Sequence, residues 1–382
     1  MRIVKLFMVA LGIMAASVAP APAAETITVG AILAVTGGAS FLGAPEAKTL
    51  EMLVDDINAK GGIHGKKISL IIKDSAGDAE KAISFAKQLM DEEKVLAIIG
   101  PSTSGETMKI KDLAEQNGTI LLSCAAAETI VNPVAKYVFK TPQKDSDAVK
   151  KIFLQMKKMG ISKIGVLSSN TGFGGAGKAQ LEKLAPENGI QILISEVYDK
   201  AATDLTAEVT KLKAANVQAI VNWSIEPAQA IVIKNARQAG MTMPIFQSHG
   251  FGNIKYVSAA GAAAEGVIFP AGRLLVADAL SDKNPQKALL LSYKKAYEEK
   301  YKEDVSTFGG HAYDAMRILE QALKAAGKSA DKEKIRTTIE NMKGLVGTAG
   351  IFNFSAADHN GLDLNAFEML TVKNGKFAVL EK

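Results

Sequence analysis

The 382-residue sequence contains one cysteine, Cys124, and only four histidines. A single cysteine excludes an intramolecular disulfide, so the fold must be stabilised by large apolar cores, which a hydrophobic content of 48% can supply. The histidines His64, His249, His311 and His359 are scattered and lack the spacing of metal ligands. We therefore expect no disulfide, no metal site and no cofactor.

The sequence also lacks a marked charge of either sign and, beyond its N-terminus, any run of about 18 apolar residues. The formal net charge of +5 falls to +3 without Arg2 and Lys5, which lie near the chain start. Basic and acidic residues are interspersed, a pattern that gives no footprint for nucleic acid. We expect no nucleic-acid partner and no membrane-spanning segment in the mature protein.

The first 23 residues have the pattern of an export signal. Arg2 and Lys5 precede an apolar segment over residues 6–18, and residues 21–23 form an A-x-A cleavage site. At about 13 residues, the apolar segment is too short to cross a bilayer of roughly 30 Å. We predict a signal peptide over residues 1–23 and, because no cysteine lies at the cleavage site, an exported soluble protein without a lipid anchor.

The remaining residues are too many for one ordinary core, and their strand and helix patterns occur in two similar halves. In the first half, the segments with the pattern of buried strands are 27–33, 67–73, 95–99 and 119–122. In the second half, they are 163–167, 190–197, 218–221 and 244–246. Helical patterns such as that of residues 45–60 lie between the strands, which predicts α/β lobes with mostly parallel sheets.

The C-terminal third departs from this alternation. Long helices are predicted over residues 284–301 and 310–326, followed by strands over 366–372 and 377–380 that an Asn-Gly turn joins. Strands at the end of a chain must pair with an existing sheet. We therefore expect several connections between the two domains.

The strand predicted at residues 95–99 ends in a run of small and hydroxyl residues before a helical pattern begins. Ser102 and Ser104 lie in this run. In an open α/β sheet, such a junction is where ligands bind, and the free N–H groups of the helix start suit a carboxylate or phosphate. An ordinary turn with a good N-terminal cap would have the same residues, so both interpretations remain open at this point.

A second junction, residues 172–177, matches G-x-G-x-x-G, and Glu196 lies where a ribose-binding acid would be. However, residues 168–171 separate the strand from the first glycine, whereas the dinucleotide fingerprint requires glycine at the strand end. We therefore favour a glycine-rich loop that presents Phe173 to a cleft, and an exported dinucleotide-using enzyme is a remote alternative. No G-x-S-x-G motif marks a nucleophile, so no catalytic residue is predicted.

The histidines and aromatic residues are interpreted by their positions. His64 and His359 lie close to glycines in predicted turns, which indicates the surface, and His311 is expected in core or hinge packing. His249 ends a buried strand, where it could contact a ligand or cap the strand. The aromatic residues at strand ends, which would suit an apolar or ring-shaped ligand, are Phe41, Phe173, Trp223 and Phe251.

Four short motifs carry a resemblance to a known family. They are Asp56 to Ile63, Asp74-Ser75, Ile98 to Pro101 and the helix around Asp314. Together they resemble the type I periplasmic binding proteins of branched-chain amino acid transporters, over essentially the whole chain after the signal peptide. The resemblance implies a periplasmic protein that is not an enzyme. We expect it to be a monomer that closes on a small carboxylate and passes it to an inner-membrane ABC permease.

The family fold has two Rossmann-like α/β lobes with parallel sheets, joined by three crossings of the chain. We expect lobe 1 to comprise residues 24–142 and 273–345, and lobe 2 to comprise residues 143–272 and 346–382. The resemblance also implies roles for individual residues. Ser104 matches the serine that holds the ligand's carboxylate, Ala125 matches a residue whose backbone contacts the ligand, and Phe173 matches an aromatic contact to the ligand side chain.

Three positions depart from the family pattern. Ala127 replaces a threonine, Ile225 replaces a tyrosine, and His249 replaces the acid that pairs with the ligand's ammonium group. A buried ammonium without a carboxylate partner is costly, so we predict a carboxylate ligand without an α-amino group. The candidate ligand-binding residues are Phe41, Ser102, Ser104, Ala125, Ala127, Phe173, Ile225 and His249.

The aromatic residues would suit an aromatic acid such as a benzoate or hydroxycinnamate. Residues 137–143 also look like the subgroup of this family that takes up such compounds. The alternative is a branched-chain or related amino acid, with Glu226 as the partner of its ammonium group.

Overall fold

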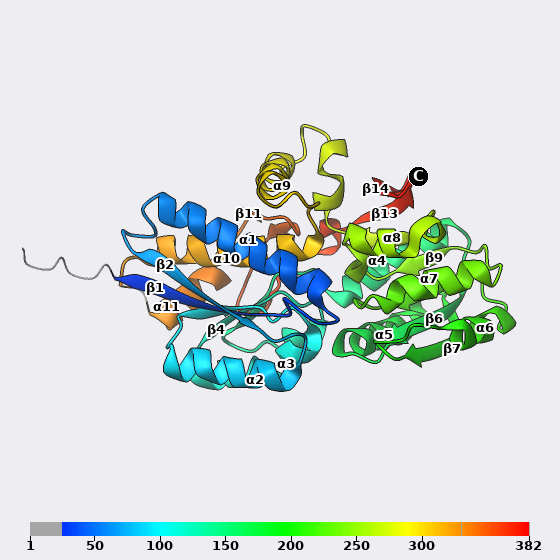
Figure 1. Ribbon diagram of the computed structural model, residues 1–382, viewed down its shortest axis with the longest axis horizontal. Coiled ribbons are helices and arrows are strands. Elements are labelled where there is room, and N and C mark those ends of the chain that lie inside the picture. The colour runs from blue at the N-terminus through cyan, green and yellow to red at the C-terminus, as the bar shows by residue number, and fades with distance from the viewer. Residues whose placement is uncertain (1–24, 330, 382) are drawn as a thin grey trace, which may run out of the picture.

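The computed structural model describes residues 25–329 and 331–381 and has two α/β lobes side by side (Figure 1). The first lobe contains a five-stranded sheet in the order β2-β1-β3-β4-β5, in which every neighbouring pair is parallel. Its strands are β1 (Thr26–Leu33), β2 (Lys67–Asp74), β3 (Ala97–Ile99), β4 (Ile120–Ser123) and β5 (Val138–Lys140). The predicted signal peptide lies outside the described residues.

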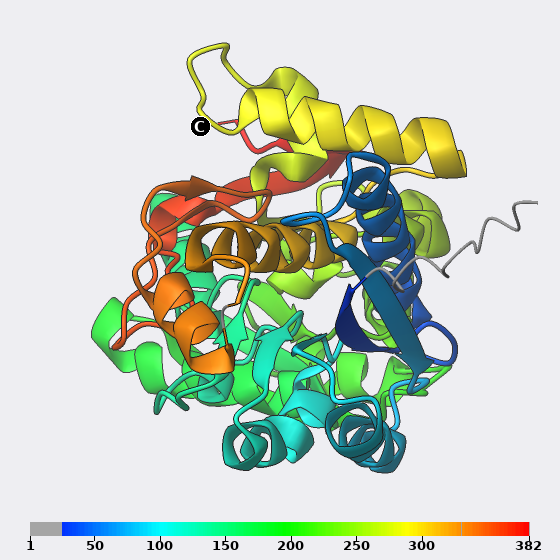
Figure 2. The same cartoon turned by 90° about the vertical axis from the view of Figure 1, so that its left-hand side faces the viewer.

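Helices cover both faces of the first sheet (Figure 1; Figure 2). They are α1 (Ser40–Ala59), α2 (Ala79–Lys87), α3 (Ser104–Asn117), α10 (Thr307–Ala326) and α11 (Lys332–Glu340). Because side chains alternate along a strand, Val29, Ala31 and Leu33 pack in the core under α1 and α10, whereas Ile32 packs in the core under α2 and α3. The sheet is therefore buried on both faces, as its continuous apolar strands predict.

The second lobe contains a seven-stranded sheet in the order β14-β13-β10-β9-β8-β6-β7. Its strands are β6 (Lys163–Ser169), β7 (Gln191–Tyr198), β8 (Ala219–Trp223), β9 (Ile245–Gln247), β10 (Ile268–Ala271), β13 (Glu368–Lys373) and β14 (Lys376–Val379). Its helices are α4 (Asp145–Lys158), α5 (Gly172–Leu184), α6 (Thr206–Ala214), α7 (Ala228–Gln238) and α8 (Ile254–Ala260). The C-terminal strands join this sheet antiparallel, with β13 against β10. The expected pairing of the tail with an existing sheet is confirmed.

The chain passes between the lobes three times, after β5, after β10 and before β13, as the fold prediction requires. Side-chain hydrogen bonds tie these crossings together. Gln143 Nε2 donates to the carbonyl of Ala349 at 2.8 Å, and Gln286 Nε2 donates to the carbonyl of Gly347 at 2.9 Å. The carboxylate of Asp314 on α10 accepts from the N–H of Ala349 at 2.8 Å. The three segments therefore form one hydrogen-bonded hinge.

The α9 helix (Lys287–Tyr301) follows the second crossing and lies outside the main layers (Figure 2). Its Tyr293 and Tyr297 pack in a small apolar cluster with Leu274. The hydroxyl of Tyr293 lies 2.7 Å from Oγ1 of Thr49 on α1. The helix is thereby attached to the first lobe beside the hinge.

The segment after α11 also belongs with the first lobe by packing. It contains a short hairpin of β11 (Leu345–Val346) and β12 (Ile351–Phe352). The apolar side chains of this segment that join the first core are Ala349, Phe352, Phe354, Leu362 and Ala366. Phe367 is the first to join the second core. The lobe boundary expected at residues 345 and 346 therefore precedes the change in core packing, which falls between Ala366 and Phe367, and the domain limits stay a prediction.

The α1 helix begins at Ser40 and not at residue 45 as predicted. Pro45 therefore lies inside the helix. Proline has no N–H, so it cannot donate to the carbonyl four residues earlier, that of Phe41. This free carbonyl accepts a hydrogen bond from Nδ2 of Asn253 in the second lobe at 2.9 Å. A local defect in the helix thus becomes a contact between the lobes.

The expectation that His359 lies at the surface is wrong. Its side chain is fully buried, and its ring stacks on Phe139 with a centroid distance of 4.1 Å. Its Nδ1 lies 2.8 Å from the carbonyl of Val138, and its Nε2 lies 3.1 Å from Oε1 of Glu340. The neighbouring glycine does mark a turn, but this turn folds back over β5. His64 is exposed, as expected.

Candidate functional site

A small cavity lies between the lobes, at the carboxyl ends of strands from both sheets. Its free volume is about 20 Å³, the space of a single water molecule. Ser102, Ser104 and Ala125 reach it from the first lobe, and Ile225 and His249 reach it from the second. The other lining residues are Leu42, Cys124, Ala126, Pro142, Phe173, Gly250, Phe308 and His311. The structure therefore brings together six of the eight candidate residues.

The lobes are closed on each other where α5 meets α3. A Cβ atom on Gly172 would lie 2.8 Å from the Cα atom of Gly105, closer than real Cβ atoms approach. The absence of a side chain at Gly172 lets the two helix starts meet backbone to backbone. Because the cavity has room for only one water molecule in this closed arrangement, a larger ligand requires the lobes to separate.

A larger cleft of about 830 Å³ opens outside the cavity. The starts of α3, α5 and α7 line it, with Glu106 on one lobe and Lys200 and Lys234 on the other. Phe173 and Ile225 line both spaces and so form the wall between them. The outer cleft and the inner cavity are therefore neighbouring spaces.

The β3–α3 junction has the geometry that the sequence predicts. Gly100 follows β3 directly and has a φ of +96°. A Cβ atom there would lie 2.2 Å from the carbonyl oxygen of Ile32, so glycine is required. Thr103 caps the first turn of α3 with its side chain. Ser104 opens the helix, and its Oγ accepts from the N–H of Ala127 at 3.2 Å. Its hydroxyl hydrogen therefore remains available for a ligand acceptor.

Ser102 is bonded to a buried carboxyl group. Its Oγ donates to Oε2 of Glu46 and accepts from the N–H of Ala34 at 3.0 Å. Burial raises the pKa of the Glu46 carboxyl group to about 8, although the hydrogen bond from Ser102 acts in the opposite direction. Glu46 is therefore largely uncharged at neutral pH, and the Ser102 hydroxyl is committed to it rather than to a ligand.

The residues after β4 form the side of the cavity next to Ser104. Ser123 Oγ accepts from the N–H of Ala125 at 3.1 Å, which holds Ala125 against the cavity. Ala127 lies behind Ser104 and contacts the site only through its N–H. Cys124 is buried, and burial raises the pKa of its thiol well above the usual value. It is a small apolar wall residue, as its position in the sequence indicates.

The glycine-rich segment forms the first turns of α5, whereas a loop was predicted. A Cβ atom on Gly174 would lie 2.0 Å from the carbonyl oxygen of Ser169, and one on Gly177 would lie 2.0 Å from Nε1 of Trp223. These glycines are required by contacts within the protein, which removes the basis of the dinucleotide alternative. Phe173 projects from the same turn into the cavity and is 2% exposed.

Replacing Gly177 with alanine should destabilise the protein by about 1–3 kcal/mol, because the added methyl group would overlap the indole of the fully buried Trp223. Urea unfolding measures the change. Gly175→Ala is the matched control, since it lies on the same helix and its Cβ would have no neighbour within 4 Å. Equal stabilities of the two variants would contradict this packing role.

His249 lies just after β9 and is 6% exposed. The rings of Phe173, Trp223 and Phe367 meet its ring edge to face, with centroid distances of 5.3, 5.6 and 5.7 Å. Burial lowers the pKa of His249 well below its usual value, and the nearby charge of Lys140 adds to this shift. The imidazole is therefore neutral at the pH of most cells, and it faces the cavity.

His311 reaches the cavity from α10 of the opposite lobe. It is 6% exposed, and burial lowers its pKa to about 3. Its ring meets that of Phe308 edge to face at 6.4 Å. The interpretation as core or hinge packing missed its exposure to the cavity, because a buried helix face in the sequence does not show which core it borders.

Two buried charged residues lie behind His249, and the sequence gave no sign of them. Asp145 is the first residue of α4, and its Oδ1 lies 3.8 Å from Nε2 of His249. Lys140 is fully buried at the end of β5 and donates to the carbonyl of Pro142 at 2.7 Å. Burial raises the pKa of Asp145 and lowers that of Lys140, while their mutual attraction opposes both shifts. An aspartate at a helix start is ordinarily a cap, which hid this role.

Several residues expected near the ligand lie elsewhere. Phe41 packs on Tyr256 of the second lobe, with ring centroids 5.2 Å apart, and is not among the cavity's lining residues. Phe251 is fully buried and stacks on Tyr256, with ring centroids 5.8 Å apart. Glu226, the alternative ammonium partner, accepts from Oγ of Ser224 at 2.7 Å and lines the outer cleft. These side chains are occupied by contacts within the protein.

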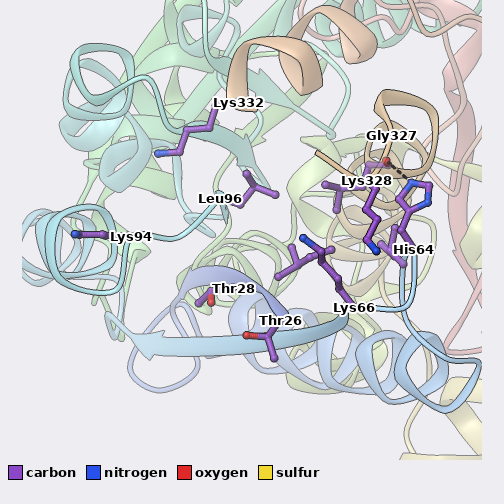
Figure 3. Close-up of a pocket in the computed structure, with 12 residues that line it drawn as sticks. Thr26, Thr28, His64, Lys66, Lys94, Leu96, Gly327, Lys328 and Lys332 are labelled. Carbon is purple, nitrogen blue, oxygen red and sulfur yellow. Dashed lines mark hydrogen bonds between the residues drawn. The ribbon is translucent and has the colours of Figure 1, made fainter. Parts of the chain in front are cut away.

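A separate basic pocket of about 290 Å³ lies at the opposite end of the first sheet, where β1 begins. Figure 3 shows His64, Lys66 and Lys328 on one side of it and Lys94 and Lys332 on the other. Lys66 is paired with Glu25 at 2.7 Å, and Lys332 donates to Thr119 at 2.7 Å. This pocket has no connection with the inter-lobe cavity.

The chain matches a protein-family model described as periplasmic binding protein over residues 26–376. The chain belongs to this family. The match includes both sheets and the three crossings, and it confirms the resemblance on which the sequence motifs were interpreted. Proteins of this family are the substrate-binding components of ABC transporters and not enzymes. In the part of this periplasmic binding protein that the structure describes, no helix is both long and apolar enough to cross a membrane.

Two relatives have names that include a ligand. A Pseudomonas aeruginosa protein named leucine-, isoleucine-, valine-, threonine- and alanine-binding protein is 25% identical, over 82% of this chain and 82% of its own length. A Brucella melitensis protein named Leu/Ile/Val-binding protein homolog 3 is 25% identical, over 93% of this chain and 94% of its own length. Leucine, isoleucine and valine occur in both names.

Two crystal structures agree with this fold. An extracellular ligand-binding receptor from Rhodopseudomonas palustris has a TM-score of 0.88 at 29% identity, covering 94% of this chain and 100% of that one. The branched-chain amino acid transporter substrate binding protein LivJ from Streptococcus pneumoniae, in complex with isoleucine, has a TM-score of 0.80 at 27% identity, with the same coverage. Both lobes of the periplasmic binding protein are therefore matched.

Proposed function

We propose that this periplasmic binding protein delivers a small carboxylic acid to an inner-membrane ABC permease, and that the acid is aromatic, such as a benzoate or hydroxycinnamate. The observation that carries the proposal is the chemistry of the cavity wall. Phe173, Phe308 and two neutral imidazoles line it, and none of its lining residues is Asp, Glu, Lys or Arg. Such a wall suits a ring and offers no direct partner for a buried ammonium group.

In this proposal the carboxylate binds at the start of α3. The Ser104 hydroxyl donates to it, and the N-terminal end of the helix attracts its negative charge. Leu42 and Ile225 cover the apolar body of the ligand from opposite lobes. Closure then removes the ligand from water, with Phe173 as the wall toward the outer cleft. The protein binds and releases the acid without changing it.

A branched-chain amino acid is the second candidate ligand. The relatives named above support it, because their names include leucine, isoleucine and valine. Within this chain, the specific observation that favours it is Asp145, a buried carboxyl group whose Oδ1 lies 3.8 Å from His249. In this alternative, the carboxyl group of Asp145 is the partner that attracts the ligand's ammonium group beside His249.

Replacing Ser104 with alanine should weaken binding of the natural ligand about tenfold or more, because a hydrogen bond to a charged carboxylate is lost in a water-free cavity. Isothermal titration with benzoate, cinnamate, leucine and isoleucine would measure this and identify the ligand class. Ser258→Ala, at an exposed serine of α8, is the matched control. Tight binding of leucine without any response to the aromatic acids would refute the aromatic proposal, and full affinity of the Ser104 variant would refute the carboxylate site.

We also propose that the chain is exported by the signal peptide predicted over residues 1–23 and acts as a monomer in the periplasm. N-terminal sequencing of the exported protein and its mass in solution would test both statements.

A further inference from the structure

The basic pocket where β1 begins is lined by residues from four separate segments of the first lobe (Figure 3). Besides β1 itself, these are the turn between α1 and β2, the turn before β3, and the segment from the end of α10 to the start of α11. The basic residues among its twelve lining residues are His64, Lys66, Lys94, Lys328 and Lys332, and none of the twelve is Asp or Glu. Basic residues that are far apart in the sequence therefore surround one space.

The positive charge of the basic pocket is only partly balanced. Nζ of Lys66 lies 2.7 Å from Oε2 of Glu25. Within residues 25–329 and 331–381, no other ion pair involves a basic residue of the pocket, which leaves Lys94, Lys328 and Lys332 without an acidic partner. Ammonium groups gathered around one space repel one another, and a bound anion relieves this repulsion.

Lys332 is fixed in the wall of the pocket by a neutral partner. Its Nζ donates to Oγ1 of Thr119 at 2.7 Å, and burial lowers the pKa of its ammonium group. The acid next to it in the sequence, Asp331, is used elsewhere, because its Oδ1 accepts from the N–H of Lys334 at 2.8 Å as the cap of α11. An ammonium group has three donors, so Lys332 keeps donors for a ligand.

The start of β1 forms one side of the pocket, below the lysines in Figure 3. β3 pairs only with Val29–Ala31, and the N–H of Leu96 donates to the carbonyl of Thr28 at 2.9 Å. At Thr26, in the part of the chain that the structure describes, β1 therefore has a neighbouring strand on its β2 side alone. The pocket occupies the position that a longer β3 would fill. Thr26 and Thr28 add uncharged hydroxyl donors to it.

We infer that the basic pocket binds a phosphate group or another oxyanion that carries at least two negative charges. The positive charges of Lys94, Lys328 and Lys332, unpaired among the described residues, exceed the single charge that one carboxylate balances. The pocket's free volume of about 290 Å³ accepts such an anion while the lobes stay closed, in contrast to the inter-lobe cavity of about 20 Å³. All its lining residues belong to the first lobe, so binding is independent of lobe closure and of the solute in the proposed function.

Proton NMR of the mature protein, titrated with inorganic phosphate at constant pH, tests the inference at a single residue. The ring signals of His64 should shift and saturate with a Kd of about 1 mM or below, because this histidine lines the pocket. Those of His249 and His311 should stay in place, since both line the inter-lobe cavity. The variant His64→Gln assigns the signal. Sodium chloride at the same ionic strength is the control for general screening.

Replacing Lys94 and Lys328 together with glutamine should weaken phosphate binding about tenfold or more, because two charged donors are lost. The matched control replaces Lys157 and Lys163, two exposed lysines of the second lobe, and loses the same net charge. Equal weakening in the two double variants would overturn the inference, because it would show that the net charge of the protein, and not the pocket, attracts the anion.

Vesicles distinguish the two sources of such a group. Cosedimentation with phosphatidylcholine vesicles that contain phosphatidic acid, lost in the Lys94 and Lys328 double variant, would support the site and assign it to a lipid headgroup. Saturable binding of inorganic phosphate without cosedimentation would support a soluble ligand. If neither phosphate nor these vesicles bind, the inference is overturned. The proposed function is tested separately, by titration of the inter-lobe cavity with organic acids, so either proposal can fail without the other.

Discussion

Replacing Glu46 with glutamine should stabilise the protein by a margin that grows with pH, by about 4 kcal/mol between pH 5 and pH 8 as an upper limit. Burial raises the folded-state pKa of Glu46 to about 8, against an ordinary value of 4.5. Between these values the folded state holds a proton that the unfolded state has lost. The wild-type protein therefore loses stability as pH rises through this window, whereas a glutamine is neutral throughout. Urea unfolding of both proteins at the two pH values measures the margin.

The difference in unfolding free energy between the wild type and the variant reports on Glu46 alone, because other buried acids such as Asp314 titrate equally in both proteins. Glu92→Gln is the control, since it makes the same chemical change at an exposed glutamate. A glutamine variant whose margin is the same at pH 5 and pH 8 would show that Glu46 has an ordinary pKa in the folded protein. It would also remove the reason for regarding Ser102 as bonded to a neutral acid.

Replacing Gly172 with alanine should weaken ligand binding about tenfold or more while leaving each lobe folded. The added methyl group would lie 2.8 Å from the Cα atom of Gly105 on the opposite lobe, so the closed arrangement would be blocked or strained. Because only the closed arrangement encloses the ligand, a penalty on closure appears directly as lost affinity. Isothermal titration with the best-binding acid measures this loss, and small-angle X-ray scattering with the same acid should show a more open shape.

Gly175→Ala is the matched control for this change. It lies in the same helix, gains the same methyl group and has no neighbour within 4 Å of the new atom. Both substitutions improve the helix propensity of α5, so thermal stability should rise slightly or stay constant in both. Unchanged affinity in Gly172→Ala would mean that ligand binding does not require the helix starts to meet.

Features determined by neighbouring residues were predictable from the sequence. The alternation of strands and helices, the turn at Asn374 and the junction from Gly100 to Ser104 follow from side-chain periodicity and from backbone angles that few residue types adopt. The cavity was largely predictable for the same reason, since strand ends of a parallel sheet meet at one edge. His249 was assigned to the site in this way, whereas Ile225 was assigned through the family resemblance.

Features that depend on distant parts of the chain were not predictable. Residues around His359 have the composition of an exposed turn, and only the fold covers them with β5 and α11. Asp145 has the sequence position of a helix cap, and its charge matters only because Lys140 and His249 pack against it. Phe41 was assigned to the ligand because it lies at a strand end, but it belongs to the first turn of α1 and packs on Tyr256 of the second lobe.

Neither lobe is encoded by one continuous stretch of chain, and this determines when the protein can fold during synthesis. The first core needs Ala312 and Leu319 of α10, and the second sheet needs Leu370 of β13. A ribosome must therefore make most of the chain before the first core can form. It must make nearly all of the chain before the second sheet can form. Contacts at such separations also form slowly, because loop-closure entropy opposes them. Neither core can therefore be completed until late in synthesis.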